Sequence, residues 1–258
     1  MKHSCIALIP ARSGSKRIKH KNIRELYGHP LLAYSIVSSL ESNIFSKVIV
    51  STDSKLYADV ARYYGADVPF LRPSEFAQET SPDIEWISYT LQFLREKGEL
   101  YDYFAILRPT SPFRKPETLK RAWNMILNNP NVDSLRAVEK TTHHPAKMWI
   151  VDKEKNRMKP VMENPHKKGI LWHSLQYPSL PEVYMQNASL EIAKTRCVFE
   201  HHSISGEAIM PFFTKDDEGV DVNTEYDWYY AQRLIKEGKA TLPKILHTPF
   251  TLDYESIK

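Results

Sequence analysis

Long apolar runs are absent from the 258-residue sequence, and cysteine is scarce. No stretch approaches the roughly 18 to 20 apolar residues that a membrane-spanning helix needs, so no membrane span is predicted. Met1 leads directly into an expected strand, without the apolar core and cleavage site of a secretory signal. The two cysteines, Cys5 and Cys197, lack any metal-ligand spacing, as is typical of ordinary thiols in a reducing compartment. These absences favour a soluble, cytoplasmic protein.

Several phosphate-binding and catalytic signatures are also missing. The sequence has no GxxxxGK[ST] loop, and the polar loop after the first expected strand has a single glycine, Gly14, which excludes a GxGxxG fingerprint there. No GxSxG motif is present. The charge balance is mild, because 35 basic residues face 31 acidic ones for a net charge of +4. Such a balance suits anionic small molecules better than a long nucleic-acid track.

The sequence does contain a regular alternation of strand-like and helix-like segments. Apolar runs predict strands at residues 5–10, 47–51, 67–72, 101–109, 133–139, 182–194 and 208–214. Helical periodicity and capping residues predict helices at residues 29–42, 55–65, 83–98, 117–129 and 224–238. This order indicates a doubly wound α/β fold, with a mostly parallel sheet and helices on both faces. Ligands are expected at the carboxyl ends of its strands, in the loops after Pro10, Ser51, Leu71 and Leu107.

The alternation stops between about His143 and Pro181. This segment is rich in charge, proline and aromatic residues, with Trp149, Met158 and Trp172 among its charges. We expect it to form a two-stranded excursion that serves dimerisation, because it has no helix of its own in which to bury these side chains. The whole chain, residues 1–258, is expected to be one domain that carries this excursion.

The loop after the first predicted strand combines positive charge with a flexible glycine. It reads ARSGSKRIKHKN and contains Arg12, Lys16, Arg17, Lys19 and Lys21. Around Gly14 the backbone can bend closely about an oxyanion. This mixture suits a triphosphate at the carboxyl end of a strand. On composition alone, a solvated basic loop or a nucleic-acid patch remains an alternative.

Six motifs in the same order resemble the acylneuraminate cytidylyltransferase family. They are IALIPARSGSKRIKHKNIRELYGHPLLAYSI, VIVSTDS, FLRPSEFAQET, LRPTSPFR, HHPAK and GVDVNTEYDW, and they span Ile6 to about Leu234. This family includes the CMP-sialic acid synthetases and relatives that activate other nonulosonic acids for cell-surface polysaccharides. The resemblance implies a Rossmann-like nucleotidyltransferase that uses CTP, an acidic sugar and Mg²⁺ and releases pyrophosphate. It also implies a homodimer in which the excursion contributes to the neighbour's sugar site, and no nucleic-acid partner.

The resemblance also implies the residues that bind the nucleotide. Lys21 is expected nearest the α-phosphate, with Arg12 and Lys16 as the other catalytic cations. Arg72 is expected at the cytosine ring, and Asp83 stands where the sialic acid enzymes commonly have serine. The nucleotide-binding set is Ala11, Arg12, Ser13, Gly14, Ser15, Lys16, Asn22, Arg72 and Asp83.

The implied acceptor-binding set departs from the sialic acid enzymes. Arg108 stands where those enzymes have glutamine, and an arginine expected around Tyr177 is missing. Because a guanidinium can bind a carboxylate or phosphate through two parallel bonds, we expect an acidic acceptor other than N-acetylneuraminic acid. A structural salt bridge is the alternative for Arg108. The expected set is Arg108, Thr110, Ser111, Lys147, Gln186 and Asn187.

The implied metal site has lost one charge. The family carries a D-x-D pair near the start of the last helix, and this sequence has Asp221-Val222-Asn223. Asp221 and Asn223 are the predicted Mg²⁺ ligands, although an amide offers only a neutral oxygen. Asp53 is a further candidate acid. Turn and helix-capping chemistry is the alternative for the pair.

Other functions remain compatible with the sequence. The same fold could act on a phosphate or phosphonate acceptor, or use another nucleoside triphosphate. A nucleotide- or RNA-binding α/β domain would bind RNA with a steep salt dependence and release no pyrophosphate. A catalytically inactive sensor is a third alternative, suggested by Asn223.

Overall fold

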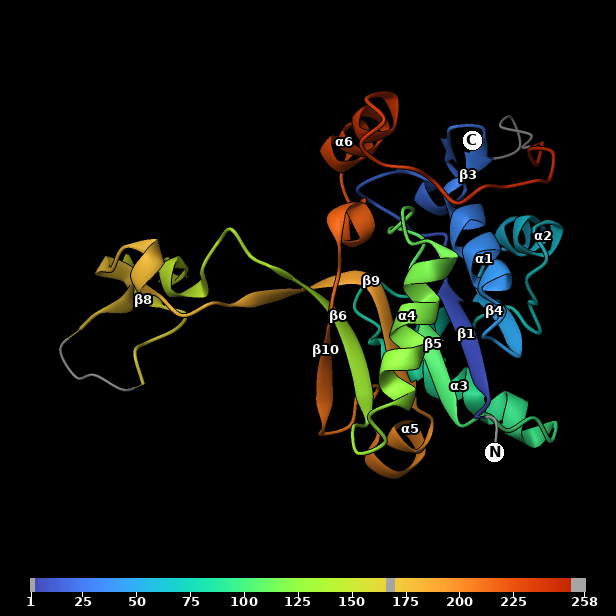
Figure 1. Ribbon diagram of the computed structural model, residues 1–258, viewed down its shortest axis with the longest axis horizontal. Coiled ribbons are helices and arrows are strands. Elements are labelled where there is room, and N and C mark those ends of the chain that lie inside the picture. The colour runs from blue at the N-terminus through green and yellow to red at the C-terminus, as the bar shows by residue number, and fades with distance from the viewer. Residues whose placement is uncertain (1–2, 166–169, 252–258) are drawn as a thin grey trace. The chain divides into compact units, whose positions relative to one another are not determined.

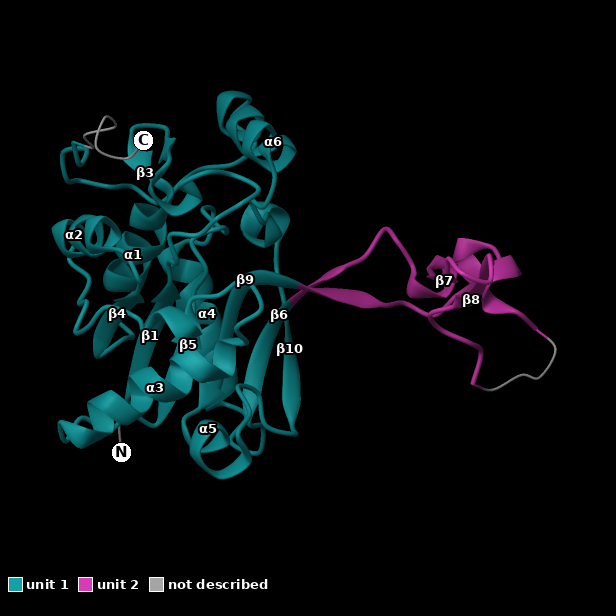
Figure 2. Ribbon diagram, turned by 180° about the vertical axis from the view of Figure 1, so that it is seen from behind, with its two compact units in different colours: residues 1–137, 187–258 teal, residues 138–186 magenta. Residues whose placement is uncertain are grey.

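The computed structural model describes residues 3–165 and 170–251 (Figure 1). It divides into two compact units, which are shown in different colours in Figure 2. The first unit combines residues 1–137 with residues 187–258, and the second unit consists of residues 138–186. The second unit therefore begins before and ends after the excursion that composition predicts.

A mixed sheet forms the centre of the first unit. Within the described ranges, six strands are hydrogen-bonded in the order β10-β6-β9-β5-β1-β4. Strand β1 pairs in parallel with both β4 and β5, and β9 runs antiparallel to β5. The strands are β1 (Cys5–Pro10), β4 (Lys47–Ser51), β5 (Tyr103–Ile106), β6 (Ser134–Lys140), β9 (Tyr184–Lys194) and β10 (Ile209–Phe213).

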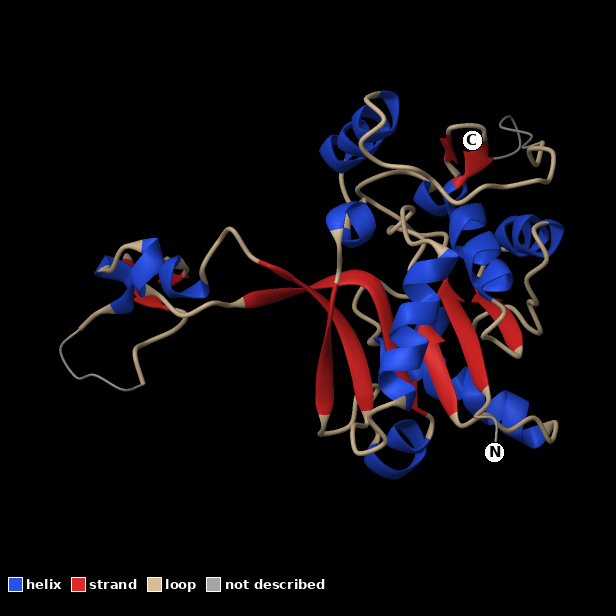
Figure 3. Ribbon diagram, viewed as in Figure 1, coloured by secondary structure: helices blue, strands red, loops and turns tan. Residues whose placement is uncertain are grey.

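Helices cover both faces of this sheet, because successive side chains of a strand point to opposite sides. Cys5, Ala7 and Ile9 of β1 pack with α1 (Leu31–Ser42), α2 (Lys55–Tyr63) and α4 (Pro116–Leu127). Ile6 and Leu8 pack with α3 (Asp83–Glu96) and α5 (Arg196–His201) on the other side. Figure 3 shows α4 in front of the strands and α3 behind them. The predicted doubly wound α/β fold is confirmed.

The last helix, α6 (Glu225–Lys236), packs against the loop that follows β1. Ile18 of that loop and Trp228 of α6 share a buried cluster with Leu26 of the short strand β2 (Glu25–Leu26), which pairs with β3 (His29–Pro30). Thr224 caps the start of α6, where its side chain accepts from the Asp227 N–H and the Asp227 side chain accepts from the Thr224 N–H. This packing brings the turn before α6 next to the turn η1 (Lys21–Ile23).

The predicted strand at residues 67–72 is wrong. Only Asp67 pairs with β4, where its N–H donates to Val48 O over 2.8 Å and its carbonyl accepts from Val50 N over 2.9 Å. Pro69 has no N–H and cannot extend such a ladder. The chain continues instead as a loop that contains the turn η2 (Ser74–Phe76). This loop is therefore available to line a site beside β4.

The second unit contains the predicted pair of strands. Strands β7 (Trp149–Asp152) and β8 (Arg157–Pro160) form an antiparallel hairpin, accompanied by the turns η3 (Pro145–Lys147), η4 (Trp172–Ser174) and η5 (Tyr177–Ser179). Residues 166–169 of the predicted excursion lie outside the described residues. In neither unit does a described helix combine the length and apolarity that crossing a membrane requires.

Candidate active site

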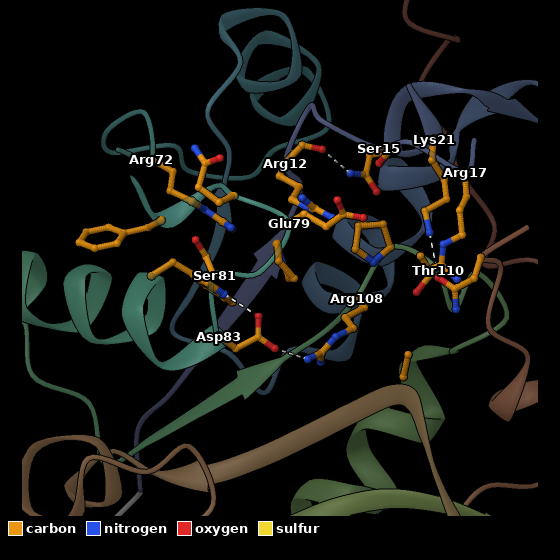
Figure 4. Close-up of a pocket in the computed structure, with 18 of the residues that line it drawn as sticks. Arg12, Ser15, Arg17, Lys21, Arg72, Glu79, Ser81, Asp83, Arg108 and Thr110 are labelled. Atoms are coloured by element: carbon orange, nitrogen blue, oxygen red, sulfur yellow. Dashed lines mark hydrogen bonds and ion pairs between the residues drawn. The ribbon is translucent and has the colours of Figure 1, made fainter. Parts of the chain in front are cut away.

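A cavity of about 370 Å³ lies in the first unit, next to the carboxyl ends of β1 and β5 (Figure 4). It is lined by the loop after β1, the segment between Arg72 and Trp86, the turn after β5, and the turn before α6. In Figure 4, Arg72 and Lys21 lie on opposite sides of this cavity, with Arg12 between them. The position agrees with the rule that open α/β sheets bind ligands at strand carboxyl ends.

The cavity carries an excess of positive charge. Its lining contains five cations and three carboxylates, which leaves a net charge of +2. An excess of cations at this position favours a polyanionic ligand such as a triphosphate. The cations are Arg12, Arg17, Lys21, Arg72 and Arg108, and the acids are Glu79, Asp83 and Asp221.

The loop after β1 is held by Asp53. The Ser13 N–H donates to Asp53 Oδ1 and the Ser13 hydroxyl to Oδ2, each over 2.8 Å. The Asn22 side chain donates to Arg12 O over 3.1 Å, which closes the loop from its far end. Asp53 does not belong to the cavity lining. Its carboxylate fixes the backbone and hydroxyl of Ser13, and its candidate role as a further metal ligand stays a prediction.

Only part of the predicted loop set faces the cavity. Arg12, Ser15, Lys21 and Asn22 line it, whereas the other predicted loop residues do not, namely Ala11, Ser13, Gly14 and Lys16. Lys16 is exposed and forms an ion pair with Glu79 over 2.6 Å. This pair links the loop after β1 to the loop before α3, both of which contribute to the lining.

Lys21 meets the turn before α6. Its Nζ donates to Val222 O over 2.9 Å and to Asn223 Oδ1 over 3.0 Å. The Asn223 amide nitrogen in turn donates to Asp221 Oδ2. Burial lowers the pKa of Lys21 to about 8, while the Asp221 carboxylate acts in the opposite direction. The ammonium group therefore stays mostly charged at neutral pH, at the edge of the cavity.

Arg72 is buried against an aromatic ring. Its guanidinium donates to Ser51 Oγ and to Ser51 O, each over 2.9 Å, and lies 4.7 Å from the centre of the Trp86 ring. Burial lowers the pKa of Arg72 to about 10, against the opposing effect of Asp53. The cation is thus rigidly placed on one wall of the cavity.

Arg108 belongs to a row of alternating charges. Its guanidinium donates to Asp83 Oδ2 and, over 2.8 Å, to Glu191 Oε1, while Arg136 lies 3.1 Å from Glu191 Oε2. Asp83 Oδ1 also accepts from the Trp86 indole N–H over 2.7 Å. Burial opposes the charge on Arg108, but Glu191 and Asp83 outweigh this effect and raise its pKa. Arg108 and Asp83 therefore line the cavity as an ion pair.

A second arginine fixes the turn that carries Arg108 and Thr110. Arg114 is fully buried and donates to Ser189 O, to Ser35 Oγ over 2.8 Å and to Arg108 O over 3.2 Å. These bonds connect the turn to β9 and α1. Burial, followed by the repulsion of Arg108, lowers the pKa of Arg114 to about 9.

The predicted acceptor set is divided between the two units. Thr110 lines the cavity, and its carbonyl accepts from Val222 N over 2.8 Å. Ser111 and Asn187 are buried but do not line it, and the Asn187 amide donates to Thr214 Oγ1 over 3.0 Å. Lys147 and Gln186 belong to the second unit. There the Lys147 ammonium donates to the carbonyls of His173 and Leu175 over 2.7 and 2.5 Å.

Sequence reasoning missed part of the lining. Arg17 is one of the cations of the loop after β1, but no binding role was predicted for it. The segment before α3 adds Phe76, Gln78, Glu79 and Ser81, and α3 itself adds Trp86. The remaining members are Pro10, Pro109 and Ala188. The motif FLRPSEFAQET pointed to the segment before α3. Ala188 gave no signal, because its approach depends on the antiparallel pairing of β9 with β5.

The sequence matches a known family over most of its length. Residues 6–164 match the profile of a family described as cytidylyltransferase. This chain belongs to the cytidylyltransferase family. The predictions of family and of a nucleotidyltransferase enzyme are thereby confirmed, and the purely RNA-binding alternative is set aside.

Curated relatives of this cytidylyltransferase carry related names. It is 34% identical over 239 residues to the CMP-N,N'-diacetyllegionaminic acid synthase of Legionella pneumophila. This alignment covers 92% of this chain and 98% of the relative. It is 47% identical over 114 residues to the N-acylneuraminate cytidylyltransferase of Escherichia coli, covering 44% of this chain and 26% of that one. The pseudaminic acid cytidylyltransferase of Campylobacter jejuni is 35% identical over 139 residues, covering 54% of this chain and 59% of that one.

Solved structures share the fold of this cytidylyltransferase. CMP:2-keto-3-deoxy-manno-octonic acid synthetase, in complex with CTP, superposes with a TM-score of 0.65 over 91% of this chain and 99% of that one. The 4-diphosphocytidyl-2C-methyl-D-erythritol synthase of Anaerococcus prevotii gives 0.61 over 92% of this chain and 100% of that one. Both are 11% identical in sequence, so the likeness establishes the fold alone.

Proposed function

We propose that this enzyme transfers CMP from CTP to a nonulosonic acid, an acidic sugar, and releases pyrophosphate. The observation that carries the proposal is the cavity in which the Asn223 amide connects Lys21 to Asp221, beside a cationic loop at the carboxyl end of β1, within a cytidylyltransferase. The curated relatives named for legionaminic, pseudaminic and acylneuraminic acids support this choice of acceptor class.

In the proposed reaction, an acceptor hydroxyl oxygen attacks the α-phosphorus of CTP. A bond forms between that oxygen and phosphorus, the bond to the bridging oxygen of the β-phosphate breaks, and the hydroxyl proton passes to water. Arg12, Arg17 and Lys21 offset the charge that develops on the phosphate oxygens. The loop that carries them is tied to Asp53 at Ser13, and the Lys21 ammonium is held by Val222 and Asn223 before nucleotide binds.

The residues before α6 fit a magnesium ion. Asp221 Oδ1 is buried without a hydrogen-bond partner and belongs to a side chain that lines the cavity. Mg²⁺ prefers oxygen ligands, keeps several waters and binds together with substrate phosphates, so one carboxylate can suffice. Asp221 would hold the ion, which when bound neutralises phosphate charge and polarises the α-phosphate.

We place the acceptor beside the Arg108 and Asp83 ion pair. The guanidinium is balanced by two carboxylates, and it still lines the cavity. An acceptor carboxylate would meet a cation whose position is fixed by Asp83 and Glu191. We expect a diacetamido nonulosonic acid to be a better acceptor than N-acetylneuraminic acid, in line with the relative aligned over 92% of this chain.

We further propose that the active enzyme is a homodimer. Ile150, Val151, Met158 and Val161 are each more than half exposed on the second unit. Val151 and Met158 are paired across the hairpin and share one face, whereas Ile150 lies on the other. Exposed apolar side chains of this kind favour burial against another protein surface. A second copy of the chain would cover them.

The direct test is pyrophosphate release from CTP, UTP, GTP and ATP with a panel of acceptors. The panel contains N,N'-diacetyllegionaminic, pseudaminic and N-acetylneuraminic acids, together with a phosphonate. We expect release only with CTP and a nonulosonic acid, and mass spectrometry should detect the CMP-sugar. Release with another nucleotide, or with the phosphonate alone, would overturn the proposal.

A further inference from the structure

The orientation of the Asn223 amide is determined by both of its neighbours. Its Oδ1 accepts from Lys21 Nζ over 3.0 Å, and its Nδ2 donates to Asp221 Oδ2. A lysine ammonium has only donors, and a carboxylate has only acceptors. Turning the amide over would oppose donor to donor and acceptor to acceptor. The oxygen that could bind a metal therefore points to Lys21.

The backbone around Asn223 holds it in this position. Its N–H donates to Asp227 Oδ2 over 3.0 Å, as part of the cap of α6. The preceding residue, Val222, is fully buried, and its N–H donates to Thr110 O over 2.8 Å. If the amide rotated away from Lys21, its oxygen would lose Lys21 and its nitrogen would lose Asp221. The fixed backbone could not move to restore either contact.

These contacts leave one carboxylate oxygen for a divalent cation. Asp221 Oδ2 is engaged by Asn223, whereas Oδ1 is buried without a partner. In the part of the chain that the structure describes, no group of three or more histidine, cysteine, aspartate or glutamate side chains could hold a metal ion. A single carboxylate is a weak site until phosphate oxygens join it.

We infer that Asn223 is a positioning residue that orients Lys21 and Asp221 with the two ends of its amide, and that the enzyme binds its divalent cation only together with the nucleotide triphosphate. The inference rests on the proposed function, because CTP supplies the missing oxygen ligands. It differs from the family pattern, in which a second carboxylate stands at this position.

The test measures Mn²⁺ binding by electron paramagnetic resonance, without turnover. Because CTP alone chelates Mn²⁺, each titration with nucleotide is compared with the same CTP concentration without protein. Wild-type protein without nucleotide should leave Mn²⁺ free, whereas protein with CTP should bind more Mn²⁺ than CTP alone. With CTP, Asn223→Ala should weaken Mn²⁺ binding about 10- to 100-fold, the usual effect of losing a group that orients a metal ligand. Without CTP, Asn223→Asp should tighten Mn²⁺ binding by about ten-fold or more, since affinity rises with the charge of the ligands.

Asn128→Asp is the matched control, because it adds the same charge at an exposed position outside the cavity lining. It should leave Mn²⁺ binding unchanged in both conditions. The inference is overturned if wild-type protein binds Mn²⁺ equally well without CTP, or if Asn223→Ala has no effect with CTP. Pyrophosphate release by the wild type tests the proposed function separately, so enzyme that turns over but binds Mn²⁺ without nucleotide refutes only this inference.

Discussion

At the scale of single residues, the sequence identified charges but not their partners. Arg12, Lys21 and Asp221 were found from the loop and the motifs, and the structure places them around one cavity. The partners are distant in sequence, since Lys21 contacts Asn223 across 202 positions and Arg108 contacts Glu191 across 83. Such pairings depend on how strands neighbour one another, which local composition does not encode.

Lys21→Ala should lower turnover about 100-fold or more, the scale of losing one preorganised electrostatic group. Its contacts to Val222 and Asn223 are two hydrogen bonds, so the melting temperature should change much less than the rate. Lys19→Ala is the control, because Lys19 belongs to the same loop but is exposed and absent from the cavity lining. Steady-state kinetics that give both variants the same rate would remove Lys21 from the site.

Asp83 and Arg108 should act as one unit. Arg108→Gln alone leaves the partly buried Asp83 without its cation, and Asp83→Asn alone leaves Arg108 with only Glu191, whereas the double variant removes both charges of the pair. We expect a coupling free energy of unfolding of about 1 to 3 kcal/mol from a double-mutant cycle in urea. In the same variants, Arg108→Gln should raise KM for the acceptor more than KM for CTP. Additive effects on unfolding would show that the ion pair contributes nothing beyond its two members.

At the scale of elements, helical periodicity predicted the helices well. Apolar runs predicted the strands less well and did not predict how the strands pair. The expected strand at residues 67–72 failed because Pro69 cannot donate to the ladder, a signal in the sequence that the apolar residues around it outweighed in the prediction. The insertion of β9 antiparallel beside β5 was equally invisible, since a buried strand reads the same in either direction. That insertion brings Glu191 to Arg108, so part of the site followed from pairing alone.

Asp133 connects β6, β10 and α5 and should contribute stability that depends on pH. Its Oδ2 accepts from the N–H groups of Glu207 and Ala208, each over 3.1 Å, and its Oδ1 pairs with Arg196 over 2.5 Å. The Ala208 N–H contributes most to holding the pKa of Asp133 below its ordinary value, with burial acting against it.

Because the folded pKa lies below the unfolded one, this stability is complete above the unfolded pKa, about 4. It is lost as the pH falls through the folded value. Asp133→Asn should cost about 1 to 3 kcal/mol of unfolding free energy at pH 7, since two backbone donors and Arg196 lose a charged acceptor. Urea unfolding of both proteins checks this, and their difference should shrink in strong acid. A difference that stays constant with pH would contradict the assignment.

At the scale of the whole molecule, the family resemblance predicted the enzyme class and composition predicted the two-stranded excursion. The homodimer remains a prediction. Multi-angle light scattering at micromolar protein should give twice the mass of the chain, and a monomer would contradict the proposal. Replacing both Val151 and Met158 by glutamate should shift the mass towards one chain, because these two residues are paired across the hairpin on one face and would place two charges in the proposed interface. Tyr226→Glu, on an exposed side chain of α6 in the first unit, should leave the mass unchanged.

The bond pair between Ser13 and Asp53 has a thermodynamic consequence for nucleotide binding. A loop that is ordered when the chain folds has already lost its conformational freedom before CTP arrives. Asp53→Asn should return that freedom to the free protein, so calorimetry should record a more unfavourable entropy of CTP binding in this variant. The enthalpy should change little, because Asp53 itself lies outside the cavity lining. The affinity of this enzyme for its nucleotide is therefore set in part during folding.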